Sequence, residues 1–255
     1  MRAVATNTAE PSKVLMILAF AAIFVLWGSA YLAIRYTVET LPPFLMAGVR
    51  AFVAGLILFG FVGVPRLGTL TWAHWRTAII SGGLFFLGCH GLLFQMERTI
   101  DSGVAALILA TIPGWMVILS CLTGQTALTA RTLVGLILGL TGVGLLVLQT
   151  EYNARPVCSP VAACVLLVSA MSWAFGSLYG RSAPLPEHAG TATAMQLLCG
   201  GALAILVGLL IGEGSHVDLA HVSMRSAFSL LYLIVFGSLV SFRSYCKTSK
   251  LNSAR

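Results

Sequence analysis

The sequence predicts an all-α membrane protein with about eight transmembrane helices. Hydrophobic residues make up 58% of its 255 positions and charged residues only 9%, whereas a soluble domain carries about 25% charged residues. Apolar runs of roughly 20 residues, the length that crosses about 30 Å of hydrocarbon, alternate with short polar turns. A lipid bilayer is therefore the expected partner of the surface. The Lys and Arg residues are scattered singly, so the net charge of +7 does not indicate a nucleic-acid partner.

Eight apolar runs follow one another, and each ends at polar or turn residues such as Pro42-Pro43 and Pro65-Arg66. The first run passes 20 residues without a small-residue cleavage site, so it is expected to be a retained span rather than a cleaved signal. The predicted spans are 14–35, 43–63, 77–96, 102–123, 132–149, 160–180, 190–212 and 227–242.

The basic residues predict the orientation, because Lys and Arg are enriched in the cytoplasmic loops of membrane proteins. If the N-terminus lies inside, ten basic residues fall on the inner side, four on the outer side, and Arg50 lies within a span. Both termini are therefore expected in the cytoplasm, with the chain in a bacterial-type inner membrane. The inner set is Arg2, Lys13, Arg66, Arg76, Arg131, Arg181, Arg243, Lys247, Lys250 and Arg255, and the outer set is Arg35, Arg98, Arg155 and Arg225.

A short motif occurs twice, 148 residues apart: WGSAY at residues 27–31 and FGSLY at residues 175–179. Each copy lies in the first span of a half, and five spans separate the two copies. Because five is odd, the second copy enters the membrane from the opposite side. Inverted repeats of this kind build many secondary transporters, whose substrate site lies at the repeat interface near the bilayer midplane. The repeat therefore predicts a carrier that works by alternating access.

The repeat also predicts how the chain is divided. A lead (1–13) precedes the first five-span repeat (14–149), and a partial second repeat (160–242) precedes a polar tail (243–255). A full second copy would end near residue 298, so two spans are expected to be absent; the alternative is a protein that naturally has eight spans. A shortened second repeat leaves two alternatives to a working carrier. These are an inactive fragment and a subunit that completes its cavity by pairing as a homodimer.

Three stretches resemble EamA-type members of the drug/metabolite transporter superfamily. Residues 27–58 (WGSAYLAIRYTVETLPPFLMAGVRAFVAGLIL) resemble the family's opening, 102–115 (SGVAALILATIPGW) its fourth span, and 172–181 (SWAFGSLYGR) the start of its second half. The resemblance covers about residues 14–242. It implies a ten-span carrier with cytoplasmic termini, built from two inverted EamA repeats around a central cavity, that exports or takes up amino acids, metabolites or drugs. The chain departs from this pattern by lacking spans nine and ten.

Arg50 is the first candidate for a substrate-binding residue. An Arg near the centre of a transmembrane helix costs about 2.5–3.5 kcal/mol, so it normally faces protein or a water-filled cavity. Arg50 lies eight residues into the second predicted span. There its guanidinium would bind a substrate carboxylate through two parallel hydrogen bonds. The structural alternative is an Arg that pairs with carbonyls of a neighbouring helix or with Glu97.

Aromatic and polar side chains near the two motif copies form the second group of candidates. Trp27 and Tyr31 are four residues apart and therefore share a helix face, with Ser29 beside them. Such groups suit a cavity for amphipathic small molecules, and aromatic packing between helices is the alternative. The corresponding group in the second half is Trp173, Tyr179 and Gln196.

The remaining candidates lie in the third and fourth spans. His90 titrates near neutrality, which permits a proton-coupling role, but a hydrogen bond between helices is the simpler interpretation. Pro113-Gly114 is expected to bend the fourth span, with Trp115 following the bend toward the cavity.

Three further pairs are expected to be structural. Glu97 and Arg98 are adjacent at the outer end of the third span and are expected to form a solvated ion pair. The spacings Gly135/Gly139 and Gly200/Gly201 predict close helix contacts, because small residues let two backbones approach.

The sequence lacks the motifs of enzymes and of ATP-driven carriers. It contains no GxSG serine with a partner His, no HExxH, no paired intramembrane Asp and no GxxxxGK[ST] loop. The six cysteines form no CxxC pair and are expected to be packing residues, so no metal or other cofactor is expected. The chain is therefore predicted to be a secondary transporter of small molecules and not an enzyme, with export as the favoured direction.

Overall fold

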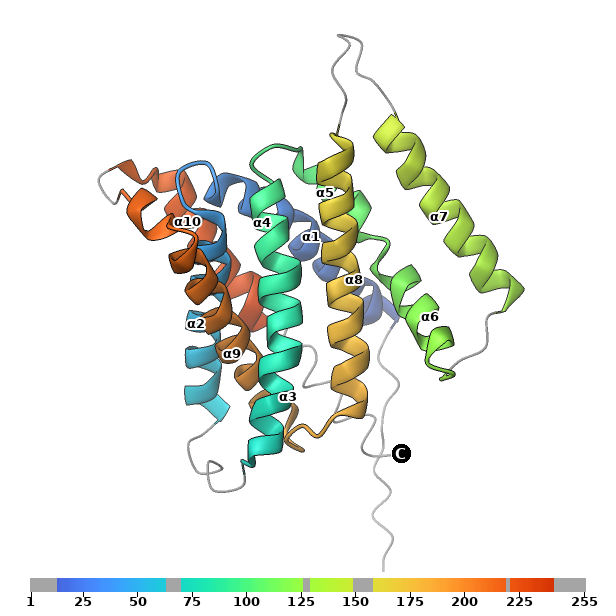
Figure 1. The fold of residues 1–255 in the computed structure, drawn as a ribbon, viewed down its shortest axis with the longest axis horizontal. Coiled ribbons are helices and arrows are strands. Elements are labelled where there is room, and N and C mark those ends of the chain that lie inside the picture. The colour runs from blue at the N-terminus through green and yellow to red at the C-terminus, as the bar shows by residue number, and fades with distance from the viewer. Residues whose placement is uncertain (1–12, 63–69, 126–128, 149–157, 219–220, 241–255) are drawn as a thin grey trace, which may run out of the picture.

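A computed structural model describes residues 13–62, 70–125, 129–148, 158–218 and 221–240 (Figure 1). The described residues form helices and turns, with no strand among them. Helical segments occupy each of the eight predicted spans, which confirms the all-α membrane fold. The predicted tail at 243–255 and residues 1–12 of the lead lie outside the described residues.

The eight spans are built from single helices or from consecutive helical segments. Within the part of the chain that the structure describes, five helical stretches are long and apolar enough to cross a membrane: Pro43–Phe61, Trp72–Met96, Ser102–Leu122, Pro160–Ser182 and Ala189–Leu210. The segments are α1 (Lys13–Thr37), α2 (Pro43–Val62), α3 (Trp72–Gly82), η2 (Gly83–Gly91), α4 (Leu92–Met96), α5 (Ser102–Leu109), α6 (Ile112–Leu122), α7 (Ala130–Leu148), α8 (Pro160–Ser182), α9 (Ala189–Leu210), η3 (Glu213–His216), α10 (Met224–Tyr232) and η5 (Leu233–Val240).

The third span begins five residues before its predicted start at residue 77. Thr71 caps the helix, because its side chain accepts a hydrogen bond from the backbone N–H of His74 at 3.4 Å and the His74 ring accepts one from the backbone N–H of Thr71 at 3.3 Å. Such reciprocal capping satisfies N–H groups that a helix start otherwise leaves unpaired. A polar cap therefore extends this helix beyond the apolar run.

The fourth span is broken as predicted, just ahead of Pro113. α5 ends at Leu109, and α6 starts at Ile112 with the proline in its first turn. Proline fits the first turn of a helix because its missing N–H would be unpaired there in any case. The bend turns α6 away from the axis of α5 (Figure 1).

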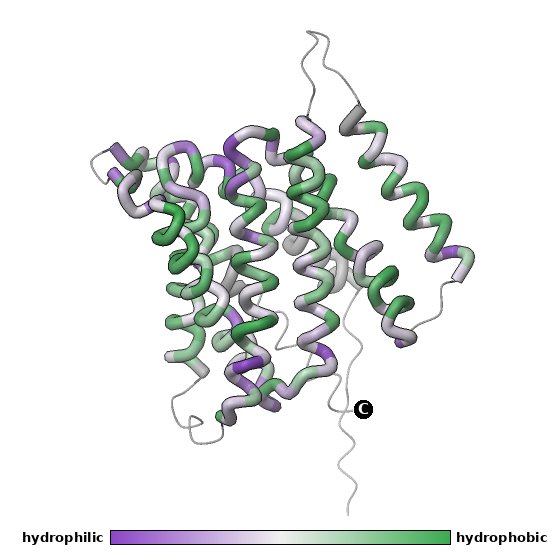
Figure 2. Tube along the Cα trace, viewed as in Figure 1, coloured by the Kyte–Doolittle hydropathy of each residue, from purple (hydrophilic) through white to green (hydrophobic). Residues whose placement is uncertain are grey.

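Two spans contain π-helical segments, η2 in the third and η5 in the eighth. Their first residues are 150 positions apart, since 233 minus 83 is 150. In Figure 1, α1 rises through the view and α8 descends, so the two helices that carry the repeated motif run in opposite directions. Figure 2 shows hydrophobic residues along the helices and hydrophilic residues gathered mainly near their ends.

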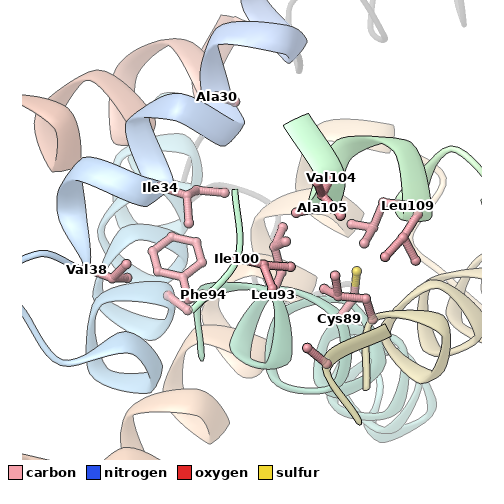
Figure 3. Close-up of a cluster of buried hydrophobic side chains, with 14 of the residues drawn as sticks. Ala30, Ile34, Val38, Cys89, Leu93, Phe94, Ile100, Val104, Ala105 and Leu109 are labelled. Carbon is pink, nitrogen blue, oxygen red and sulfur yellow. The ribbon is translucent and has the colours of Figure 1, made fainter. Parts of the chain in front are cut away.

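Most of the buried apolar residues form one core between α1, α4, α5 and α8. Figure 3 shows Ile34 of α1 and Val38, which follows α1, beside Phe94, with Leu93 facing Ile100 and Val104. The end of the third span is therefore held inside a packed bundle.

Gly200 and Gly201 of α9 make close backbone contacts, as predicted. A Cβ atom on Gly201 would lie 2.5 Å from the backbone nitrogen of Phe52 in α2, and one on Gly200 would overlap the carbonyl of Gly82 in α3. The prediction for Gly135 and Gly139 was wrong, since no described atom of another helix lies within 4 Å of a Cβ built on either residue. The reason is that α7 packs mainly against α5 and leaves its glycine face uncovered.

Candidate substrate site

Arg50 lies in α2 and is buried, with only 4% of its surface exposed. Its guanidinium carbon is 5.6 Å from the centre of the Phe94 ring, a cation–π distance. Its Nε has no hydrogen-bond partner among the described residues. The expected alternative of an ion pair with Glu97 is absent, because the ion pairs of the described residues join Asp218 to His221 and Glu39 to Arg225. The buried guanidinium therefore keeps a donor available for a ligand.

The π-helical segment η2 brings Cys89 and His90 within electrostatic reach of Arg50. Two serines of α8 fix this segment: Ser169 donates a hydrogen bond to the Cys89 carbonyl at 2.9 Å, and Ser172 donates to the Leu84 carbonyl at 2.8 Å. π-Helical turns are rare and occur often at functional sites. Here the widened turn is held by a helix of the second half of the chain.

His90 belongs to an aromatic cluster between η2 and α8. Its ring stacks on Phe86 at 5.4 Å and meets the edge of Trp173 at 5.5 Å, while Trp173 lies 4.7 Å from Phe85. Its Nδ1 is hydrogen-bonded to the Phe85 carbonyl at 2.9 Å. These are the contacts of a packing residue, and the proton-coupling role of His90 stays a prediction.

Of the three predicted residues of the second half, the structure brings one into the aromatic cluster around His90 and leaves two apart from it. Trp173 reaches the cluster through His90. Gln196 of α9 instead donates a hydrogen bond to Ser81 of α3 at 2.9 Å, which ties those two helices together. Tyr179 is half-buried further along α8, toward its C-terminal end.

The three predicted residues of α1 separate in a similar way. Tyr31 is half-buried and packs against the main apolar core. The hydroxyl groups of Ser29 and Tyr232 are hydrogen-bonded at 2.6 Å. Trp27 is 64% exposed, so the structure does not place it with Arg50. The reason is that neighbouring helices leave this part of α1 uncovered, as Val25 is also 69% exposed.

Trp115 follows the break in the fourth span, as predicted, and lies between α6 and α8. It packs with Leu119, Ala174 and Leu178 in a cluster separate from the main core. Its indole N–H is buried and has no hydrogen-bond partner among the described residues. Trp115 therefore offers a second buried donor without a partner among the described residues, in addition to Nε of Arg50.

Two hollows lie away from Arg50. A groove of about 650 Å³ separates the α5–α6 bend from α7 and is lined by apolar and small residues, with Thr111 and Thr132 as its polar members. A smaller hollow of about 250 Å³ lies at the end of the bundle where α1 leads into α2, and Glu39, Arg98 and Glu213 line it. Neither hollow is lined by Arg50, His90 or Trp173.

Glu97 is a buried residue whose environment the sequence did not indicate. The expected solvated pair with Arg98 was wrong, because Arg98 is exposed whereas Glu97 is 0% exposed. The helical period explains the difference: Glu97 follows Leu93 and Phe94 by four and three residues, and both lie in the core. Burial raises the pKa of the Glu97 carboxyl to about 8, although the nearby Arg35 lowers it and Asp101 raises it further.

Comparisons with known proteins point to one family. The model of the EamA-like transporter family matches residues 14–148. The "Uncharacterized inner membrane transporter YedA" of Escherichia coli strain K12 is 32% identical over 231 residues, which cover 88% of this chain and 71% of that protein. A "Probable amino-acid metabolite efflux pump" of Salmonella typhimurium is 24% identical over 86% of this chain and 73% of its own length. A crystal structure that is 20% identical shares the fold, with a TM-score of 0.59 over 89% of this chain and 75% of that one.

Proposed function

Because this chain belongs to the EamA-like transporter family, we propose that it is a secondary carrier that exports amino acids or related small metabolites, with Arg50 binding the substrate carboxylate. The chain is a multi-pass membrane transporter; the substrate, the direction and the role of Arg50 are the proposal. The observation that carries the proposal is a guanidinium buried to 4% exposure whose Nε is unpartnered. Leaving such a donor unpaired inside a bundle is costly, and a bound anion removes that cost.

The chemistry around Arg50 favours an amphipathic substrate. Phe94 lies under the guanidinium, and Phe86, His90 and Trp173 form an aromatic cluster beside it. A carboxylate would occupy the guanidinium while the apolar part of the substrate contacts the rings. An amino acid has both parts. The name of the Salmonella relative, which concerns amino-acid metabolites, supports this substrate class.

Alternating access is supported by the arrangement of the two halves. The helices with the repeated motif run in opposite directions, and π-helical segments occur 150 residues apart, close to the 148-residue spacing of the motif. A π-helical turn interrupts the regular hydrogen-bond ladder and so offers a place where a span bends. We place the carrier in the inner membrane with both termini in the cytoplasm, because the basic residues are distributed ten to four.

The test compares Arg50→Gln and Arg50→Lys with the wild-type chain in proteoliposomes. One set of vesicles is loaded with a radiolabelled mixture of the twenty L-amino acids, and a parallel set with a mixture of amines that lack the carboxylate. The release of each mixture is measured. We expect Arg50→Gln to slow release of the amino acids at least about tenfold, since a hydrogen bond to a charged group contributes about 1.5–3 kcal/mol. Arg50→Lys should keep part of the rate because it retains the charge but not the planar fork.

The matched control is Arg131→Gln, which removes a charge from an exposed position in α7. It should release amino acids at the wild-type rate. Equal amino-acid release from the wild type and Arg50→Gln would rule out the role of Arg50. Failure of the wild type to release the amino-acid mixture would reject the proposed substrate class.

A further inference from the structure

Glu97 is a buried acidic group that the proposed substrate site does not use. It follows α4 directly and is 0% exposed. Neither Oε1 nor Oε2 has a hydrogen-bond partner among the described residues, and no ion pair in that part of the chain includes the carboxyl. An ionised carboxylate in such a place would lose its hydration without a hydrogen bond or ion pair to replace it, and the attraction of Arg35 offsets this cost only in part. The geometry therefore favours a neutral Glu97, with a proton on its carboxyl.

The cation beside Glu97 is engaged by the backbone. Arg35 of α1 donates hydrogen bonds through Nη1 to the carbonyl of Glu97 itself and to the carbonyl of Ile100, the latter at 3.0 Å. These carbonyls end the third span, where a helix leaves acceptors unpaired and a positive charge is favourable. Arg35 thus binds the main chain of the same residue whose side chain lacks a partner. The guanidinium is also close enough to the Glu97 carboxyl to favour its ionised form.

Few other charged or titratable groups face Glu97. Tyr31 and Arg35 act on it from α1, and Asp101 acts on it from the start of α5. On its own turn Arg98 is exposed, and α2 contributes Arg50, which lies over Phe94. α8 also packs against α4 but carries no Asp, Glu, Lys, Arg or His before residue 181. Arg35 is therefore the cation placed to respond to the charge of Glu97.

We propose that Glu97 and Arg35 form a proton switch that couples transport by this carrier to the proton gradient. In the described conformation Glu97 is protonated and Arg35 holds the carbonyls at the end of the third span. In the alternate conformation the carboxyl O–H bond breaks, the proton passes to water on the side that is then open, and the guanidinium binds the carboxylate. The switch rests on the proposed carrier function, but proton binding by Glu97 can be measured without any substrate.

Two physical features support the switch. Burial brings the pKa of Glu97 to about 8, near cellular pH, so a modest change in its surroundings changes its protonation. Arg35 joins the first span to the end of the third, so its movement alters a contact between two elements of the bundle. Proton release and helix movement are thereby linked through one side chain.

The test is an infrared titration of the full chain in lipid nanodiscs between pH 4 and pH 10. The carboxylic-acid C=O absorption is recorded for the wild type, for Glu97→Gln and for the matched control Glu39→Gln, whose side chain is 41% exposed. We expect the wild type to show an acid band that persists at pH 7, disappears with a midpoint near pH 8 and is absent from Glu97→Gln. Glu39→Gln should leave that band unchanged. In Arg35→Gln the midpoint should rise, because Arg35 favours the ionised form.

A Glu97 band that titrates near the ordinary value of about 4.3 would overturn the proposal. Should Glu97→Gln fail to fold, Glu97→Asp is the second variant, because it keeps a carboxyl. It is expected to shift the acid band rather than remove the band. An unshifted band would show that the band belongs to another residue. In proteoliposomes, a pH gradient should drive amino-acid accumulation by the wild type and not by Glu97→Gln. A titration near pH 8 without amino-acid flux in the wild type would reject the carrier function alone, whereas flux with an ordinary titration would reject the switch alone.

Discussion

Glycine residues lie where α9 contacts α2 and α3, and glycine residues also lie along α7. The two regions are nevertheless packed very differently. At Gly200 and Gly201 the backbones are so close that a methyl group would overlap a carbonyl or approach a backbone nitrogen to 2.5 Å. Around Gly135 and Gly139 no described atom of another helix lies within 4 Å of such a group. A groove of about 650 Å³ lies beside α7. Small residues therefore permit close contact without causing it.

The difference shows what holds a helix in this bundle. α9 is tied to α3 by the Gln196–Ser81 hydrogen bond and to the start of α2 by Glu213, in addition to the glycine contacts. α7 begins with a local hydrogen bond between Thr129 and Thr132 at 2.7 Å, within its own first turn. Lipid tails are as apolar as Leu, so burial against another helix adds little unless packing or polar bonds accompany it.

The largest effect is expected from a methyl group placed at the tight contact. Gly200→Ala should destabilise the chain by about 2–3 kcal/mol, because backbone atoms of Gly82 cannot move aside as a flexible side chain can. Gly139→Ala is the matched control and should be neutral or stabilise slightly, since alanine favours a helix by up to about 1 kcal/mol over glycine. Melting temperatures in detergent would measure both. Equal losses for the two variants would remove the distinction between the contacts.

A smaller effect is expected when apolar side chains in the two regions are shortened. Leu197 of α9 is 4% exposed and Leu138 of α7 is 68% exposed. Leu197→Ala leaves a cavity between helices and should cost about 1–3 kcal/mol, whereas lipid fills the space left by Leu138→Ala. Chemical denaturation in mixed micelles would compare them. A loss at Leu138 as large as that at Leu197 would mean that another surface covers α7.

The sequence alone predicted the eight spans, because the length and polarity of an apolar run are local properties. It missed the early start of the third span, which depends on the bond between Thr71 and His74 rather than on hydropathy. It predicted the break before Pro113, since proline blocks a helix wherever it occurs. Both glycine pairs were predicted to make close contacts, because small residues permit two backbones to approach but do not specify which helix meets them.

The candidate site was predictable only in part, for a related reason. Arg50 was singled out because a charge within a span must find protein or water, whatever the fold. Trp27 was grouped with Tyr31 by helical spacing, but packing covers only the later part of α1. Glu97 was paired with Arg98 by adjacency, although adjacent helical residues point about 100° apart. Which of two neighbours faces the core is decided by elements distant in sequence, here α1 and α8.

The smallest effect is expected at the polar clamp that joins the end of α9 to α2. Gly212 adopts a left-handed conformation with φ of 84°, which turns the chain after α9 so that Glu213 reaches back. The Glu213 carboxylate accepts hydrogen bonds from the backbone N–H groups of Phe44 at 3.2 Å and Leu45 at 2.8 Å. A carboxylate is favoured at the start of a helix, both by these bonds and by the helix dipole.

Glu213→Gln keeps an oxygen that can accept a hydrogen bond but removes the charge, so the stability should fall by about 1 kcal/mol. Glu187→Gln, at an exposed position in the turn before α9, is the matched control and should change little. Melting temperatures at low and high salt would separate the charge from the hydrogen bond, because salt screens only the former. If Glu213→Gln had no effect while Gly200→Ala had its full effect, close glycine packing rather than the polar clamp would hold α9 in the bundle.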